Sequence, residues 1–132
     1  MLCLDFAIPP LPQFVTAGHA VWKPGDRHFA RTFGVYDLLL VTKGTLYMTE
    51  EQTEYEVCAG KLLVLEAGLR HFGHRACVEH TEIYWVHFIH GHPASYISQE
   101  DIPWSALLSK GTVEDVEPST QQRMYMPKFA SV

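Results

Sequence analysis

The stretch from Gly60 to His71 limits the possible folds more than any other part of the sequence. It reads Gly-Lys-Leu-Leu-Val-Leu-Glu-Ala-Gly-Leu-Arg-His, which is a glycine, a short apolar run, a turn closed by Gly68 and a histidine. The run from Leu62 to Leu65 predicts a short strand buried on both faces, and a glycine gives the backbone the freedom that a tight turn needs. We expect this turn to direct the side chain of His71 back into the interior of a β-structure.

Short strands of this kind recur along most of the chain, and glycine-containing turns such as Pro24-Gly25, Lys43-Gly44 and Ala59-Gly60 separate them. The expected strands cover residues 14–22, 35–42, 45–49, 55–58, 62–65, 72–76 and 81–90. Such a series predicts an all-β, antiparallel sandwich or barrel. With 132 residues, the chain is long enough for one domain of this type.

The two ends of the chain differ from this strand-rich core, which we expect over residues 14–92. Residues 1–13 contain three prolines and are expected to form an extended N-terminal arm rather than a helix. Residues 93–132 are expected to hold a short helix near residues 104–109, an acidic loop and a final strand near residues 123–126. The last residues, 128–132, show no pattern of a closing element, so we expect the chain to stop short of further domains.

Composition excludes several classes of function. The formal net charge of −5 gives no basic surface for nucleic acid, and the longest apolar run, Leu38 to Val41, is far too short to cross a membrane. The N-terminus lacks the charged and apolar regions of a signal peptide. An odd number of cysteines, three at unrelated spacings, favours reduced thiols. These features together predict a cytoplasmic protein that contacts neither a membrane nor DNA directly.

The Gly60 to His71 stretch resembles the second conserved motif of the cupin family, with one departure. Cupins usually have proline in the turn, where this chain has Glu66. The resemblance implies a cupin-like antiparallel barrel, also described as a jelly roll or double-stranded β-helix, followed by a short C-terminal helical segment.

The first cupin motif can be aligned from Gly25 to Gly44, but its metal-binding residues are replaced. Arg31 and Phe33 stand at the two histidine positions, and Asp37 stands in place of the glutamate. A guanidinium stays protonated and has no lone pair to give to a metal, and Asp37 with His71 is too small a ligand set for a catalytic metal. We therefore expect a barrel without a metal and without a cofactor.

Several segments between Gly18 and His92 resemble the N-terminal sensor domain of AraC-type transcription regulators. The likeness rests on Gly18-His19, Arg31-Thr32-Phe33, Tyr36-Asp37-Leu38-Leu39, Thr42-Lys43-Gly44-Thr45-Leu46-Tyr47, the Gly60 to His71 motif with Gly73, and Tyr84-Trp85-Val86-His87-Phe88. The resemblance implies a non-enzymatic barrel that binds a small effector, often a sugar, with an N-terminal arm that covers the pocket or contacts the DNA-binding half. It also implies a homodimer that binds DNA through a C-terminal pair of helix-turn-helix units, and no such basic region occurs in this sequence.

Strand alternation selects the candidate pocket residues. An unbroken strand would place Arg31, Asp37 and Leu39 on one face, which is the inner face of a cupin barrel. In the 81–90 strand, alternate residues Trp85 and His87 share a face, but both faces are apolar and periodicity does not show which one is inward. The candidate ligand-binding residues are Arg31, Asp37, His71, Trp85 and His87, together with Trp22 and Tyr47. Aromatic, acidic and basic groups around a lumen suit a sugar or related polyol.

Structural roles remain open for each of these side chains. Arg31 and Asp37 could form a structural ion pair, and His71 could serve only as a turn residue. Trp85 and His87 could belong to the core and make no contact with a ligand. The spacings His71-x-x-His74 and His90-x-His92 resemble metal sites, but no cysteine or carboxylate is placed to complete them.

Two other functions remain open as well. The first is a small metal-dependent cupin enzyme, a dioxygenase or sugar isomerase, in which His28 or His87 would join His71 as a ligand. The second is a purely dimerising module that associates through exposed strand edges.

Overall fold

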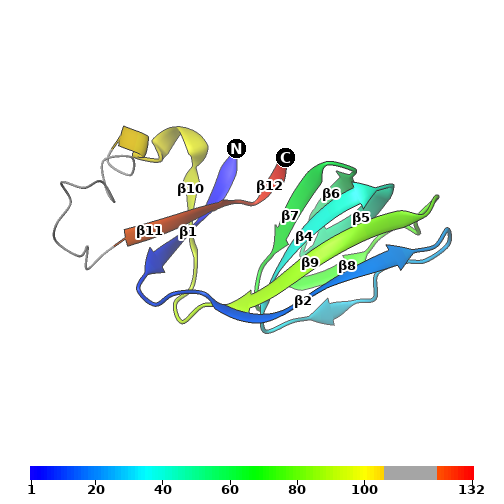
Figure 1. Ribbon diagram of the computed structural model, residues 1–132, viewed down its shortest axis with the longest axis horizontal. Coiled ribbons are helices and arrows are strands. Elements are labelled where there is room, and N and C mark those ends of the chain that lie inside the picture. Colours follow the sequence, from blue (N-terminus) through cyan, green and yellow to red (C-terminus); the bar gives the residue numbers. More distant parts are fainter. Residues whose placement is uncertain (106–121) are drawn as a thin grey trace.

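The computed structural model describes residues 1–105 and 122–132, which form strands and turns in a three-sheet arrangement (Figure 1). The strands are β1 (Leu2–Ile8), β2 (Gln13–Trp22), β3 (Arg31–Thr32), β4 (Tyr36–Lys43), β5 (Thr45–Glu50), β6 (Thr53–Cys58), β7 (Lys61–Leu65), β8 (Arg70–Gly73), β9 (Thr81–Ile89), β10 (Ser95–Ser98), β11 (Gln122–Pro127) and β12 (Phe129–Ser131). A 3₁₀ turn, η1 (Gln99–Asp101), follows β10. The short helix expected near residues 104–109 falls largely outside the described residues.

Two of the sheets form the barrel, and the third packs beside it. The five-stranded sheet has the order β12-β7-β4-β9-β2, and the four-stranded sheet has the order β3-β8-β5-β6. A three-stranded sheet, β10-β1-β11, lies to one side of both (Figure 1). The strand pairs among the described residues are all antiparallel. The all-β, cupin-like fold expected from the sequence is confirmed.

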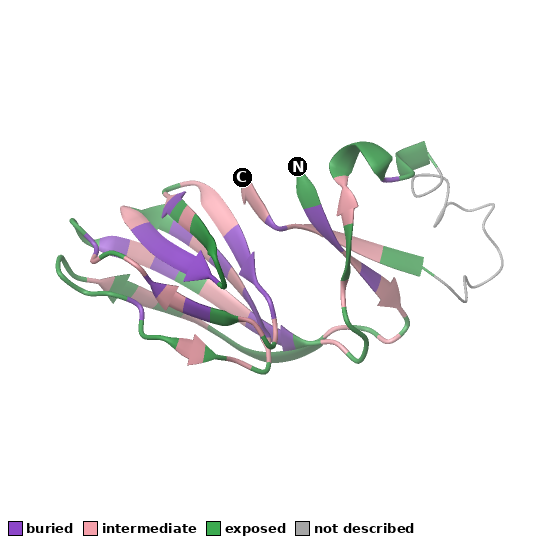
Figure 2. Cartoon of the chain, turned by 180° about the vertical axis from the view of Figure 1, so that it is seen from behind, coloured by how far each residue is buried: buried purple, intermediate pink, exposed green. Residues whose placement is uncertain are grey.

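Strand β4 is apolar on both faces because each face packs against a different cluster. Leu39 and Val41 belong to the core inside the barrel, together with residues of β5, β6, β7 and β9. Tyr36 points the other way, into a second cluster that contains Phe6 of β1 and Phe88 of β9. The three-stranded sheet therefore covers the outer face of the five-stranded sheet, and buried positions occur in all three sheets (Figure 2).

The N-terminal residues are extended, as their prolines predicted, but they are paired on both sides. Strand β1 is the central strand of its sheet, with β10 on one edge and β11 on the other. Leu4 and Phe6 are both 0% exposed. Residues 2–8 thus form a strand whose side chains pack into the second cluster, and they are not a free segment.

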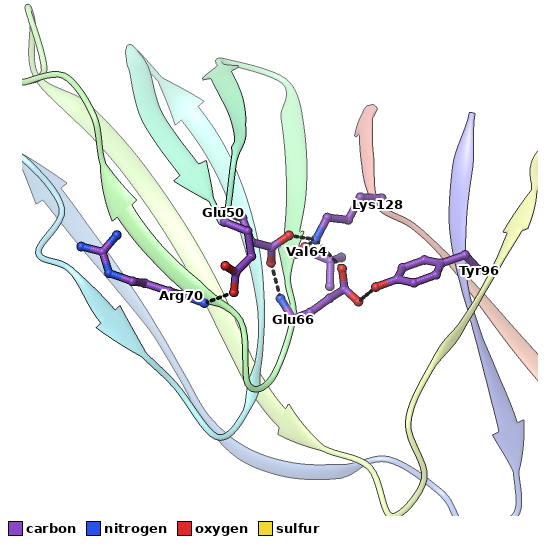
Figure 3. A network of polar contacts seen from close by, with 7 residues as sticks. Glu50, Val64, Glu66, Arg70, Tyr96 and Lys128 are labelled. Carbon is purple, nitrogen blue, oxygen red and sulfur yellow. Dashed lines mark hydrogen bonds and ion pairs between the residues drawn. The ribbon is translucent and has the colours of Figure 1, made fainter.

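The C-terminal residues contain a closing element that the sequence pattern did not predict. Strand β11 confirms the expected final strand near residues 123–126, but the chain then continues into β12, which pairs with β7. Between these strands, the side chain of Lys128 is buried beside Glu66, the residue that departs from the cupin motif (Figure 3). A strand as short as β12 carries too few residues for a periodic signal, so its pairing depends on contacts distant in sequence.

The turn of the Gly60 to His71 motif has the expected form. Gly68 has a φ of +85°, in the left-handed region that glycine favours, and its N–H donates to the carbonyl of Phe33 at 2.8 Å. Strand β8 begins at Arg70, earlier than the expected residue 72, because His71 pairs with Arg31 of β3 on one side and with Glu50 of β5 on the other. Within the described residues, no helix is long and apolar enough to cross a membrane.

Candidate functional site

A cavity of about 290 Å³ lies inside the barrel, between the five-stranded sheet and the segment that precedes β3. Its volume is near the lower end of the roughly 300–1,000 Å³ that is typical of small-molecule sites. Its walls are mainly apolar and aromatic, with a few charged groups. The lining residues are Thr16, Ala20, Trp22, His28, Phe29, Arg31, Asp37, Leu39, Ile83, Trp85 and His87.

Arg31 is the polar centre of this cavity. Its Nε donates to His71 Nε2 at 2.8 Å, and its Nη2 donates to Asp37 Oδ2 at 3.2 Å. The guanidinium lies over the ring of Phe33, with 4.0 Å between the guanidinium carbon and the ring centroid. The chain bends at residues 34 and 35, between β3 and β4, yet Arg31 and Asp37 still meet as strand alternation predicted. Arg31 is thus held by an acceptor, an anion and an aromatic face.

His71 lies behind Arg31 and is 1% exposed. Because an arginine Nε–H can only donate, His71 Nε2 carries no proton, and the neutral ring carries its proton on Nδ1. Burial, followed by the nearby positive charge of Arg31, lowers the pKa of His71 to about 4. His71 therefore acts as a neutral acceptor that orients Arg31.

Asp37 is a buried carboxylate whose two oxygens differ in their contacts. Its Oδ2 contacts Arg31 and also lies 3.3 Å from His87 Nε2. Its Oδ1 has no hydrogen-bond partner among residues 1–105 and 122–132. Burial raises the pKa of Asp37, and His87 and Arg31 oppose that change. An unpartnered buried acceptor costs free energy, so this oxygen is a place where a bound donor would be favourable.

Aromatic side chains line the cavity next to Arg31 and His71: the ring centroid of Phe29 lies 5.0 Å from the guanidinium carbon of Arg31, and the ring centroid of His28 lies 5.3 Å from that of His71. The ring of His28 stacks on Trp22, with 5.4 Å between the ring centroids, and on Phe29, with 4.6 Å. Trp22 Nε1 is buried, and it has no acceptor in the part of the chain that the structure describes. Trp85 lies in the same wall, with its ring centroid 6.3 Å from that of His87. The lining thus combines ring faces with two residues, Trp22 and Asp37, that each carry a buried polar atom without a partner among residues 1–105 and 122–132.

The structure brings together most of the residues predicted as ligand-binding. Arg31, Asp37, Trp22, Trp85 and His87 all line the cavity, and His71 contacts it through Arg31. The ambiguity of the 81–90 strand is resolved in favour of the face that carries Trp85 and His87. Direct contact between Arg31 and Asp37 means that the ion pair considered as a structural alternative is also present.

Tyr47 is the exception, because it does not line the cavity. It is buried next to Arg75, whose guanidinium carbon lies 4.8 Å from the ring centroid, and next to His74 at 6.0 Å. Its neighbours in β5, Leu46 and Met48, belong to the core inside the barrel. Alternation along the strand places Tyr47 on the opposite face, and this correction could have been made from the sequence.

His28 and Phe29 are cavity residues that strand-based reasoning missed as ligand contacts. They lie between β2 and β3 in a stretch without regular secondary structure. A non-repeating segment has no periodicity from which to infer an inward direction. The signal that was present is the pair of adjacent rings at positions 28 and 29, separated from Arg31 by one alanine.

The two histidine spacings that resemble metal sites are occupied by other contacts. His74 Nδ1 pairs with Thr49 Oγ1 at 2.9 Å, and His90 Nε2 pairs with the carbonyl of Pro10 at 2.9 Å. Among the described residues, no group of three or more His, Cys, Asp and Glu side chains is placed to hold a metal ion. Cys3, Cys58 and Cys77 are free thiols.

Acid is expected to destabilise the fold through His71. The folded-state pKa of about 4 lies below the ordinary value of 6.5, so the unfolded chain binds the proton first and stability falls as the pH drops from 6.5 to about 4. His28, whose pKa burial also lowers, acts in the same direction, whereas Asp37, whose pKa burial raises, acts in the opposite direction. Urea midpoints measured across this pH range should fall less steeply in His71→Gln than in the wild type. Equal slopes would contradict this role of His71.

Solved structures with some likeness to this chain include a conserved protein of unknown function from Streptococcus pyogenes and the plu4264 protein from Photorhabdus luminescens. The first has a TM-score of 0.49 and 19% sequence identity, with 63% of this chain and 75% of that chain covered. The second has a TM-score of 0.41 and 16% identity, with 62% of this chain and 73% of that chain covered.

Sequence comparison identifies a relative with higher identity. The chain is 39% identical over 112 residues to YisR of Bacillus subtilis (strain 168), an uncharacterised HTH-type transcriptional regulator. That alignment covers 84% of this chain but only 39% of the relative, so the chain spans well under half of its length. The AraC-like ligand binding domain family matches residues 14–117. With most of the sequence matched, the chain belongs to the AraC-like ligand binding domain family.

Proposed function

We propose that this chain is the effector-sensing part of an AraC-type transcription regulator, and that its cavity binds an uncharged, hydroxylated small molecule such as a sugar or related polyol. The single observation that carries the choice of ligand is the free Oδ1 of Asp37. It is a buried acceptor on a residue that lines the cavity, without a donor among the residues that the structure describes.

Hydroxyl groups match the polar atoms of the cavity better than charged groups do. A hydroxyl donates one hydrogen bond and accepts others, so it can donate to Asp37 Oδ1 and accept from Trp22 Nε1, which is also unpartnered within the described ranges. Asp37 would repel an anion and Arg31 would repel a cation, which favours a neutral ligand. The rings of Trp22, Phe29 and Trp85 provide apolar faces for the C–H groups of a sugar.

The chemistry around Arg31 supports a binding role rather than a catalytic one. Arg31 uses the lone pair of His71 Nε2, and His71 is the residue on which the enzyme alternative depends as a metal ligand. Arg31 also binds Asp37 Oδ2. A guanidinium at this position would also repel a cation. We therefore propose a non-enzymatic sensor without a metal or cofactor.

Regulation would follow from a difference in effector affinity between two conformations. An effector that binds one conformation better shifts the population toward it, and a DNA-binding part of the regulator reads that shift. Because the chain spans 39% of YisR, we place DNA binding in a helix-turn-helix part outside this chain, and we propose that the whole regulator is a cytoplasmic homodimer.

Titration with a panel of neutral sugars and polyols tests the proposal. Binding to the cavity should change the fluorescence of Trp22 and Trp85, and calorimetry on the same samples gives the affinity. Asp37→Asn should weaken the best ligand by about tenfold to a hundredfold, because a hydrogen bond to a charged group contributes roughly 1.5–3 kcal/mol. Asp101→Asn is the matched control, since Asp101 is exposed in η1. If no panel member saturates the protein, or if Asp37→Asn binds like the wild type, the proposed ligand class is wrong.

A further inference from the structure

A row of polar side chains leads from the cavity across the four-stranded sheet. Arg31 of β3 lies opposite His71 of β8, and His71 lies opposite Glu50 of β5. Residues directly opposite each other on neighbouring antiparallel strands have their side chains on the same face. Arg31, His71 and Glu50 therefore form a row on one face, and the first two are joined by the 2.8 Å hydrogen bond.

Glu50 continues the row into a buried ionic cluster (Figure 3). Lys128 Nζ donates to Glu50 Oε1 at 2.5 Å, to Glu66 Oε2 at 2.9 Å and to the carbonyl of Val64 at 2.6 Å. The other oxygen of Glu50 accepts from the backbone N–H of Glu66 at 2.7 Å. The side chains of Lys128, Glu50 and Glu66 are 6%, 5% and 10% exposed, so these charges are shielded from water. Lys128 is also close enough to His71 to contribute to its lowered pKa.

The cluster connects the barrel to the three-stranded sheet at two points. Tyr96 of β10 donates its hydroxyl hydrogen to Glu66 Oε1 at 2.5 Å. Lys128 itself stands between β11 of the three-stranded sheet and β12 of the five-stranded sheet. Its N–H donates to the carbonyl of Leu2 in β1 at 3.0 Å, and its carbonyl accepts from the N–H of Val64 in β7 at 2.9 Å.

We propose that this series of contacts, which we call the Arg31–Lys128 relay, couples occupancy of the cavity to the way the three-stranded sheet is held against the barrel. The relay consists of Arg31, His71, Glu50, Lys128, Glu66 and Tyr96. The proposal rests on the proposed function, because it assigns a consequence to effector binding in that cavity.

The coupling follows from a change of hydrogen-bond partners. A ligand oxygen that accepts from Arg31 Nε would remove the one partner of His71 Nε2, while His71 Nδ1 has none among the described residues. A buried imidazole without partners is costly, and its neighbour in the row is the carboxylate of Glu50. When His71 Nδ1–H pairs with Glu50, the hydrogen bond from Lys128 to Glu50 weakens. The connection that Lys128 makes between the barrel and the three-stranded sheet then weakens as well. Buried polar groups exchange between discrete pairings, so the response has two states.

Hydrogen exchange measured on Arg31→Ala, without any ligand, tests the first half of the relay. We expect the protection of β1 and β11 to fall by roughly tenfold, within the ~5–150-fold range of typical coupling free energies. Strand β6, at the edge of the four-stranded sheet that is farthest from Arg31 in β3, should keep its protection. Arg70→Ala is the matched control, because the exposed Arg70 adjoins His71 in β8 but stacks on Phe72. Equal protection of β1 and β11 in the two variants overturns the proposal, and so does a loss spread equally over β6.

The reverse direction is tested at Arg31 by nitrogen-15 NMR of its Nε–H signal. Glu66→Gln keeps the shape of the side chain but weakens the hold on Lys128, and we expect the Arg31 Nε–H to exchange with water roughly tenfold faster as its bond to His71 is disturbed. Glu54→Gln, at a side chain that is 72% exposed, is the control. An unchanged Nε–H signal in Glu66→Gln overturns the relay. Neither experiment uses an effector, so the relay can fail while sugar titration still succeeds, and the reverse also holds.

Discussion

Replacement of Lys128 by methionine is expected to lower the free energy of unfolding by roughly 3–5 kcal/mol, the usual cost of removing one partner of a buried ion pair. Lys128 is the cation between Glu50 and Glu66, and all three side chains are at most 10% exposed. Without the ammonium group, two carboxylates would remain buried next to each other, and the carbonyl of Val64 would lose its contact with Nζ. Urea denaturation at neutral pH measures the loss.

Two further variants separate the charge effect from the loss of packing. Lys43→Met, at a side chain that is 75% exposed, should change stability by no more than about 0.5 kcal/mol. Adding Glu50→Gln and Glu66→Gln to Lys128→Met removes the uncompensated charges and should restore part of the stability, because the penalty comes mainly from unpaired buried charge. A loss below about 1 kcal/mol in Lys128→Met would show that the cluster is solvated, against its observed burial.

The same cluster explains why the sequence could identify Glu66 as unusual without giving its role. The motif from Gly60 to His71 predicted the strand, the turn and the position of His71, because these depend on residues close together in the chain. The role of Glu66 depends on Lys128, which is 62 residues away, and on Tyr96, which is 30 residues away. Local patterns carry no information about pairs at such separations.

The direction in which each side chain points from its strand was harder to predict than the residue types that line the cavity. Arg31 and Asp37 were placed correctly because alternation survives the bend between β3 and β4. Both faces of β9 are apolar, since the three-stranded sheet covers Phe88 on one face while Trp85 faces the cavity on the other. Only knowledge of that second sheet distinguishes the faces. Tyr47 fails for a different reason: its residue type suits a pocket, but its place in β5 puts it on the opposite side from Met48.

Phe6→Ala is expected to lower the free energy of unfolding by roughly 3–5 kcal/mol, the usual cost of truncating a buried phenylalanine. Phe6 is 0% exposed and makes edge-on contacts with Tyr36 at 5.2 Å and with Phe88 at 6.0 Å between ring centroids. These rings come from β4 and β9, two interior strands of the five-stranded sheet, so the cavity created by truncation would lie between the two sheets. Urea denaturation and tryptophan fluorescence measure the change.

The size of this loss distinguishes an integral β1 from a mobile arm, because removal of a side chain from a detached arm would leave the stability of the barrel unchanged. Leu11→Ala is the matched control: Leu11 lies beyond the end of β1, is 70% exposed and should change stability by no more than about 0.5 kcal/mol. If Phe6→Ala behaves like Leu11→Ala, β1 spends most of its time detached, and the relay through Lys128 would have no sheet to hold. If the full loss is observed, β1 is part of the folded unit, and any response to an effector must act by shifting a packed sheet.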